Sequence, residues 1–180
     1  MSICNTTVKY GKVTKSFHFI TAILIIGMLI VGSLMGDIGD KGVKGQVYMI
    51  HKLTGLLILA VGVLFVLWST CNKKPVYPLG MKCWEKALAK IVQLSLYALI
   101  IAMPLSGWVL SSAAGHNPNF FGLFEIPMPL IPHSKMLSQT AGDLHYYFAW
   151  SLFWLITLHV LGALKHHFID RNNVMKRMFS

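Results

Sequence analysis

Four long stretches without a charged side chain constrain this sequence more than any other feature. No Asp, Glu, Lys or Arg occurs in residues 16–36, 53–72, 91–124 or 144–164. A helix needs about 20 apolar residues to cross the roughly 30 Å hydrocarbon core of a bilayer, and each stretch contains such a run. Charged residues make up only 12% of the chain, against about 25% in soluble domains. The sequence therefore predicts an integral membrane protein.

We predict four transmembrane helices in an all-α four-helix bundle. The approximate spans are residues 15–35, 47–71, 87–110 and 143–165. Four helices leave no residues for an independent soluble core, so we expect a single domain over residues 1–180. The apolar run of the first span is longer than a signal-peptide core, and no A-x-A-like cleavage site follows it, so we expect it to remain as an anchor.

Four prolines interrupt the connection between the third and fourth spans. They are Pro118, Pro127, Pro129 and Pro132. Proline breaks the interior of a helix, so residues 111–142 cannot form a continuous fifth span. We expect an exposed loop with a short interfacial helix there.

The distribution of basic residues predicts the orientation in the membrane. A net charge of +10 would suggest nucleic-acid binding in a soluble protein, but in a membrane protein Lys and Arg collect in the cytoplasmic loops. Alternating loops place twelve Lys and Arg residues on one side and four on the other. Those four are Lys41, Lys44, Lys52 and Lys135. We therefore expect both termini in the cytoplasm, lipid around the spans, and no nucleic-acid partner.

Four of the eight histidines lie within the predicted spans. These are His18 in the first, His51 in the second, and His145 and His159 in the fourth. An imidazole in hydrocarbon is costly and normally faces a partner or a cofactor. The predicted helix directions place His18 and His159 toward the cytoplasmic side, and His51 and His145 toward the outer side. The sequence therefore predicts two depth-matched histidine pairs.

The spacing on the fourth helix indicates what the pairs hold. Fourteen residues are close to four helical turns, so His145 and His159 share one face about 21 Å apart. One planar cofactor near each membrane surface, held by two histidines from different helices, is typical of a transmembrane b-type dihaem cytochrome. No C-x-x-C-H motif is present, which excludes c-type attachment. We therefore expect two noncovalent haem b groups.

Two other interpretations of the histidines are a zinc or copper site and a purely structural role. Imidazole suits both metals, but each pair supplies only two ligands, too few for tetrahedral zinc and enough for both axial positions of a haem iron. Structural histidines would be compatible with a small transporter or scaffold. The haem content of the purified protein distinguishes these classes.

The sequence resembles the bacterial cytochrome b561 proteins over most of its length. The motifs that carry the resemblance are K-Y-G-K-V-T-K-S-F-H-F around His18, M-I-H-K-L-T-G around His51, M-P-L-S-G-W with Gly107, and H-Y-Y-F-A-W with L-H-V-L-G-A-L-K-H-H-F in the fourth helix. The resemblance implies that His18, His51, His145 and His159 are the axial haem ligands.

The resemblance also implies an activity. A superoxide oxidase of this family oxidises superoxide to oxygen and passes the electron through two haems b to ubiquinone, in the bacterial inner membrane. The family's quinone region maps onto His166, with Lys165 beside it. Lys52, next to His51, is the cation we expect to attract superoxide locally. The alternative function is an electron-relay or anchor subunit that connects quinone with another redox protein.

The chain departs from the family in its basic residues. The family commonly has arginine in the second helix and at the entry to the first, where this chain has Phe65 and Lys12. Anchoring of the haem propionates must then rely on lysines. The candidates are Lys12, Lys15, Lys73 and Lys74.

Overall fold

A computed structural model describes residues 2–78 and 80–179 and is mostly helical. Its long helices are α1 (Lys12–Leu34), α2 (Lys41–Cys71), α3 (Cys83–Ala113) and α4 (Lys135–Phe168). All four are long and apolar enough to cross a membrane, as the charge-free stretches predicted. The short elements are the 3-10 helix η1 (Met35–Asp37), strands β1 (Asn119–Phe120) and β2 (Phe124–Glu125), and helix α5 (Lys176–Phe179).

Helices α2 and α4 begin several residues before their predicted spans, where polar side chains cap their first turns. Asp40 accepts a hydrogen bond from the backbone N–H of Val43 and starts α2. Ser134 does the same for Leu137 at the start of α4. Such caps satisfy backbone donors that have no partner within the helix. Hydropathy alone therefore gave only the apolar centre of each helix.

The connection between α3 and α4 differs from the sequence prediction. We expected a short interfacial helix within residues 111–142, but the described chain instead forms a small antiparallel hairpin of β1 and β2 and enters α4 at Lys135. Gly122, with φ of +82°, lies between the two strands, a conformation that glycine adopts without strain. The closely spaced prolines lack the N–H groups that another helix would need.

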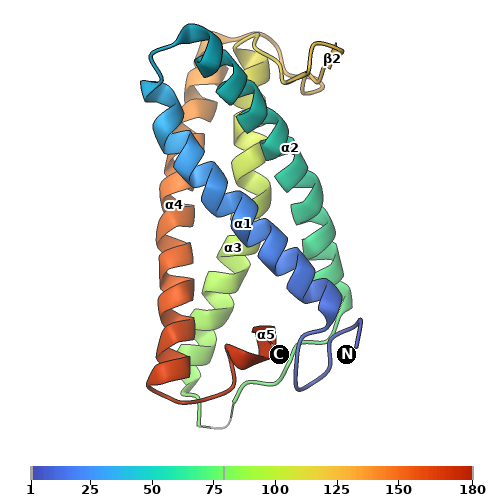
Figure 1. Cartoon of the computed structure of the whole chain (residues 1–180), viewed down its shortest axis with the longest axis vertical. Coiled ribbons are helices and arrows are strands. Elements are labelled where there is room, and N and C mark those ends of the chain that lie inside the picture. Colours follow the sequence, from blue (N-terminus) through green and yellow to red (C-terminus); the bar gives the residue numbers. More distant parts are fainter. Residues whose placement is uncertain (1, 79, 180) are drawn as a thin grey trace.

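Helices that follow one another in the chain pack together, in the order α1 with α2, α2 with α3 and α3 with α4. Within the described residues, α4 makes at most sparse backbone contact with α1 or α2. Figure 1 shows α3 between α2 and α4 over most of their length, and α1 running obliquely across the bundle. The arrangement leaves α4 standing away from the two helices that carry His18 and His51.

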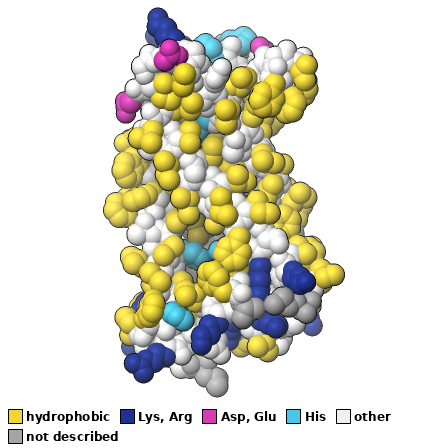
Figure 2. All heavy atoms as spheres, in the orientation of Figure 1, with side chains coloured by type: hydrophobic (Ala, Val, Ile, Leu, Met, Phe, Trp, Pro, Cys, Tyr) yellow, Lys and Arg dark blue, Asp and Glu magenta, His cyan; other side chains and the backbone are white. Residues whose placement is uncertain are grey.

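Both termini lie at one end of the bundle, with α5 folded back beneath it (Figure 1). Figure 2 shows that Lys and Arg side chains gather mostly at this end, below a broad belt of hydrophobic side chains. Exposed apolar side chains, such as Ile23 and Leu64, belong to the long helices. A belt of this kind suits contact with lipid tails rather than water.

Candidate functional site

The structure brings the four membrane histidines together in the two pairs that their depths indicated. His18 of α1 and His159 of α4 lie with ring centroids 6.2 Å apart. His51 of α2 and His145 of α4 lie with ring centroids 6.3 Å apart. In both pairs the side chains approach across the space where α4 stands away from the helix that carries its partner.

The separation of the rings can be compared with what a shared metal ion requires. Two imidazoles that bind one metal from opposite sides, each through a bond of about 2.0 Å, have ring centroids about 6 Å apart. Both observed separations match this value. No three His, Cys, Asp or Glu side chains converge as a metal-binding group within residues 2–78 and 80–179. The geometry therefore suits a two-histidine centre and not tetrahedral zinc.

His145 is oriented by α3. Its Nδ1 lies 3.0 Å from Ser106 Oγ and 3.1 Å from the carbonyl oxygen of Met103. The Ser106 hydroxyl itself donates to the Met103 carbonyl, so its oxygen is left to accept. Nδ1 must therefore carry the proton, which leaves the Nε2 lone pair for a metal. A ligating histidine is commonly held in this way through its other ring nitrogen.

Glycines make room for the rings of His51 and His145. A β-carbon at Gly107 would lie 2.8 Å from Cε1 of His145, and one at Gly32 would lie 3.3 Å from Cε1 of His51. The first distance is too short for any real β-carbon contact. The ring of His145 therefore depends on the missing side chain at position 107.

A cavity of about 600 Å³ lies beside the His51–His145 pair. It is lined by His51 and His145, by apolar side chains of α1, α2 and α3, and by the loop residues His116–Asn119. Its size and apolar lining are typical of a site for a small molecule or cofactor. The Nδ1 atoms of His18 and His51 are buried without a hydrogen-bond partner among the described residues. The paired histidines, the apolar cavity and the space that Gly107 leaves for the ring of His145 together fit a haem.

Lys52 lines this cavity. Its ammonium group donates a 2.6 Å hydrogen bond to the backbone carbonyl of His116, and the hydroxyl of Ser111 donates to the same oxygen. The lysine predicted to attract an anion therefore also ties the loop after α3 to α2.

Lys165 and His166 lie in a charged cluster at the end of the bundle that carries the termini. The ammonium group of Lys165 bridges the carboxylates of Glu85, in the first turn of α3, and Asp170. Glu85 also accepts from the backbone N–H of Lys82. Nδ1 of His166 lies 2.6 Å from Oδ2 of Asp170. The cluster joins α3, α4 and the C-terminal segment.

The residues of this charged cluster differ in how deeply they are buried. His166 and Glu85 are each 8% exposed, whereas Asp170 lies on the surface after α4. The hydrogen bonds from Lys165 and then His166 hold the pKa of Asp170 below its ordinary value, although its partial desolvation works in the opposite direction. Asp170 is therefore ionised at neutral pH and acts as an acceptor.

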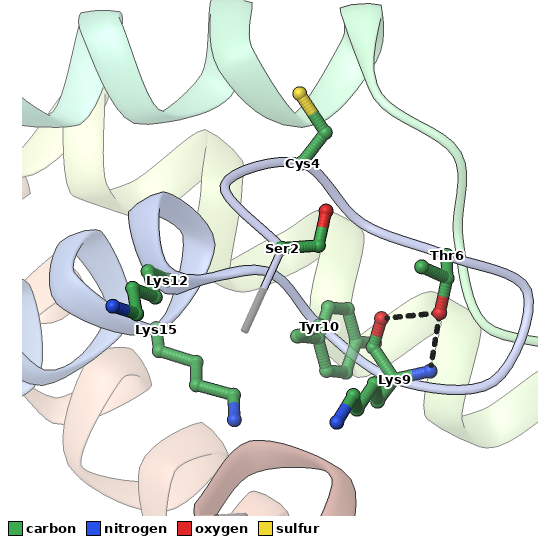
Figure 3. Close-up of a pocket in the computed structure, with 7 residues that line it drawn as sticks. All are labelled: Ser2, Cys4, Thr6, Lys9, Tyr10, Lys12 and Lys15. Carbon is green, nitrogen blue, oxygen red and sulfur yellow. Dashed lines mark hydrogen bonds between the residues drawn. The ribbon is translucent and has the colours of Figure 1, made fainter.

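A small hollow near the start of α1 contains two of the predicted propionate anchors. Figure 3 shows Lys12 and Lys15 around it with Lys9 and Tyr10. Its volume of about 10 Å³ has room for about one water molecule. Burial raises the pKa of the Tyr10 phenol. No histidine lines this hollow, so it is not part of the histidine sites.

Phe65, which occupies a position where the family commonly has arginine, joins an aromatic stack. Its ring stacks on Phe17 with centroids 5.5 Å apart and meets the edge of Tyr97 at 5.5 Å. The Tyr97 hydroxyl shares a 2.8 Å hydrogen bond with Ser69. Phe65 therefore contributes to the packing of α1, α2 and α3.

Sequence reasoning missed three contributors: Ser106, Glu85 and Asp170. Ser106 lies within the M-P-L-S-G-W motif, but its contact with His145 requires the packing of α3 against α4. Glu85 and Asp170 are the two acidic residues on the basic side of the chain. Because acidic residues are rare on that side, each of the two could have been expected to pair with a nearby lysine such as Lys165.

Comparison with known proteins adds independent information. The family described as prokaryotic cytochrome b561 matches residues 9–180. "Cytochrome b561 homolog 2" of Escherichia coli (strain K12) is 34% identical over 179 residues, which cover 99% of this chain and 95% of the relative. "Probable superoxide oxidase CybB" of Yersinia pestis is 26% identical over 174 residues, which cover 94% of this chain and 95% of that relative. The extent of the family match and the 34% identity show that this chain belongs to the prokaryotic cytochrome b561 family.

Proposed function

We propose that this membrane cytochrome holds two haem b groups and carries electrons from superoxide to ubiquinone. The family membership establishes the coarser function, electron transfer by a b-type membrane cytochrome. The observation that carries the number of haems is the presence of two histidine pairs, at 6.2 and 6.3 Å, both anchored on α4. Each bound haem supplies an iron that is reduced and oxidised by one electron.

Two separate groups of residues would each hold one haem. His51 and His145 would hold the outer haem, and His18 and His159 the inner one. The hydrogen bonds of His145 Nδ1 to Ser106 and Met103 present its Nε2 to the metal. The apolar walls of the outer cavity exclude water from the site.

The orientation follows from the charges. Lys and Arg gather mostly at the end with both termini (Figure 2), so we place that end in the cytoplasm and the chain in the bacterial inner membrane. Lys52 and the large cavity then face the outer side. His166, Lys165 and the inner histidine pair lie toward the cytoplasm.

Superoxide oxidation is supported by two features. One is the similarity to the Yersinia pestis protein that is named a probable superoxide oxidase. The other is the ammonium group of Lys52, which lines the same cavity as His51 and His145. A cation in the wall of an apolar cavity concentrates a small anion there. Electrons would leave near His166, at the other end of α4, where we place the ubiquinone site.

A relay between quinone and another redox protein is the second candidate. It is favoured by the higher identity to a relative whose printed name gives no oxidase activity. Both candidates use the same histidines. They differ in whether the chain alone reacts with superoxide or needs a protein partner.

The first test is the absorption spectrum and haem content of the purified protein. Two haems per chain, fully extracted by acid acetone, are expected. One haem per chain would contradict the two-site assignment.

The second test supplies superoxide and a soluble ubiquinone analogue to the purified chain alone. Quinone reduction at a rate proportional to the protein concentration supports the oxidase, and its absence in fully haem-loaded protein supports the relay.

A further inference from the structure

We propose that Asp170 is a positioning residue that holds His166 so that its Nε2 delivers a proton to ubiquinone as the quinone is reduced. This inference rests on the proposed function, because it concerns the quinone end of the same reaction. Asp170 lies beyond the end of α4 and would not contact the quinone. It acts through the ring of His166.

The first argument is the geometry of the His166–Asp170 contact. Nδ1 of His166 lies 2.6 Å from Oδ2 of Asp170. An ionised carboxylate can only accept a hydrogen bond, so Nδ1 donates its proton in this contact. The amide nitrogen of Asn172 lies 3.2 Å from the same Nδ1. Because Nδ1 donates to Asp170, it cannot also accept from this amide nitrogen, so Asp170 is the side-chain hydrogen-bond partner of the ring among the described residues. Nε2 is left for another partner.

The second argument is the way the carboxylate is held. Lys165 donates a 2.8 Å hydrogen bond to the same Oδ2 of Asp170 and also binds Glu85 of α3. The first turn of α3 therefore fixes the ammonium group, and the ammonium group fixes the carboxylate. His166 is 8% exposed, and a ring so enclosed and bonded at Nδ1 has a set orientation. Histidine held by a carboxylate in this way keeps the tautomer that proton transfer requires.

The third argument is position on the helix. His166 follows His159 by seven residues, close to two turns, so both lie on one face of α4 about 10 Å apart. That face also carries His145. A quinone beside His166 would therefore lie at the end of the face that carries the two histidine sites, where electrons leave.

The proton balance is simple. Reduction of one ubiquinone to ubiquinol takes up two electrons, from the oxidation of two superoxide anions to two molecules of oxygen, and two protons. The cycle begins when Nε2 of His166 takes up a proton from water on the cytoplasmic side. The N–H bond at Nε2 then breaks as an O–H bond forms on one quinone oxygen, and the ring returns to its neutral form with Nδ1–H still bonded to Asp170. Water on that side also supplies the second proton of the quinol.

The test compares Asp170→Asn with the wild type and with His167→Gln as a matched control on the adjacent histidine. Haem content and haem reduction by superoxide should be unchanged in both variants. Asp170→Asn should lower kcat for quinone about tenfold or more, a part of the 10²–10⁴-fold that general acid catalysis contributes. The KM for quinone should stay near the wild-type value, and the solvent isotope effect in D2O should rise because proton delivery becomes slower. His167→Gln should behave as the wild type.

Asp170→Glu keeps a carboxylate on a longer arm and should recover part of kcat. If Asp170→Asn does not fold, His166→Gln carries the test, since a wild-type kcat and isotope effect in a protein without the imidazole would overturn the proposal. An Asp170→Asn protein with wild-type kcat and isotope effect would overturn it directly. If the wild type with full haem content does not reduce quinone at all, the proposed function fails instead, so the two failures are distinguishable.

Discussion

The backbone of Gly107 in α3 lies against the imidazole ring of His145 in α4. A β-carbon at this glycine would come within 2.8 Å of Cε1 and 3.1 Å of Nδ1 of the imidazole. The same ring is bonded through Nδ1 to Ser106, the residue before the glycine. One turn of α3 thus both holds the ring and leaves space for it.

Gly107→Ala should displace the ring of His145 and weaken the outer haem site while the inner site stays intact. Overpacking of a well-packed region by one methyl group costs about 1–3 kcal/mol, and here the strain falls on a ligand. We expect the haem content to fall from two toward one per chain, or the outer haem to change its spectrum. The measurement is the haem-to-protein ratio with the spectrum of the reduced protein.

Gly27→Ala is the matched control, because a β-carbon at Gly27 of α1 would meet nothing within 4 Å. Alanine is favoured over glycine in a helix by about 1 kcal/mol, so this variant should retain both haems and at least the wild-type stability. Equal haem loss in both variants would show that the effect comes from general helix packing and not from His145.

The two histidine sites should be independent. His145→Ala is expected to remove or perturb only the outer haem, and His159→Ala only the inner one, since about 21 Å of helix separates the two residues. Redox titration of each variant should show one remaining haem with nearly its wild-type spectrum. Loss of both haems from either variant, in protein that is still folded and membrane-inserted, would contradict the two-site arrangement.

Much of the fold was predictable because the bilayer imposes a simple rule on sequence. A charge within a span is costly, so the charge-free stretches located all four helices. Helical periodicity then placed His145 and His159 on one face, and the alternation of helix direction paired them with His51 and His18. The two ring contacts agree with this pairing. These inferences needed only local periodicity and depth.

The rest depended on tertiary contacts that local patterns do not contain. The partner of His145 is Ser106, on a helix with no histidine of its own. The hairpin after α3 arose from turn residues and prolines, which forbid a helix without specifying what replaces it. The contact of Asp170 with His166 has the local i,i+4 spacing of a helix, but the link of Asp170 to Glu85 through Lys165 exists only because α3 packs against α4.

Lys52→Gln should slow the reaction with superoxide and leave the haem content unchanged. Glutamine removes the positive charge but keeps a donor for the carbonyl of His116, so the loop should stay in place. We expect a lower second-order rate constant for haem reduction by superoxide and a weaker dependence of that rate on ionic strength, because salt screens attraction between charges. Stopped-flow traces at several salt concentrations measure both.

Lys135→Gln controls for the overall charge of that side, since Lys135 starts α4 and does not line the cavity. It should lower the rate much less than Lys52→Gln. Equal effects of the two changes would mean that the whole surface attracts the anion and that Lys52 has no special place.

The contact between Asp170 and Lys165 should make part of the protein's stability depend on acid pH. The hydrogen bond from Lys165 holds the folded-state pKa of Asp170 below the value of about 3.9 expected in the unfolded chain. The unfolded state then binds more protons in this range, so stability rises with pH. The contribution is complete above about pH 4 and is lost as the pH falls through the lower folded-state pKa. Asp170→Asn should therefore melt at a lower temperature than the wild type at neutral pH, and the two melting temperatures should converge in acid. A melting-temperature difference that stays constant from neutral pH into the acid range would show that the Asp170 carboxylate does not stabilise the fold through its charge.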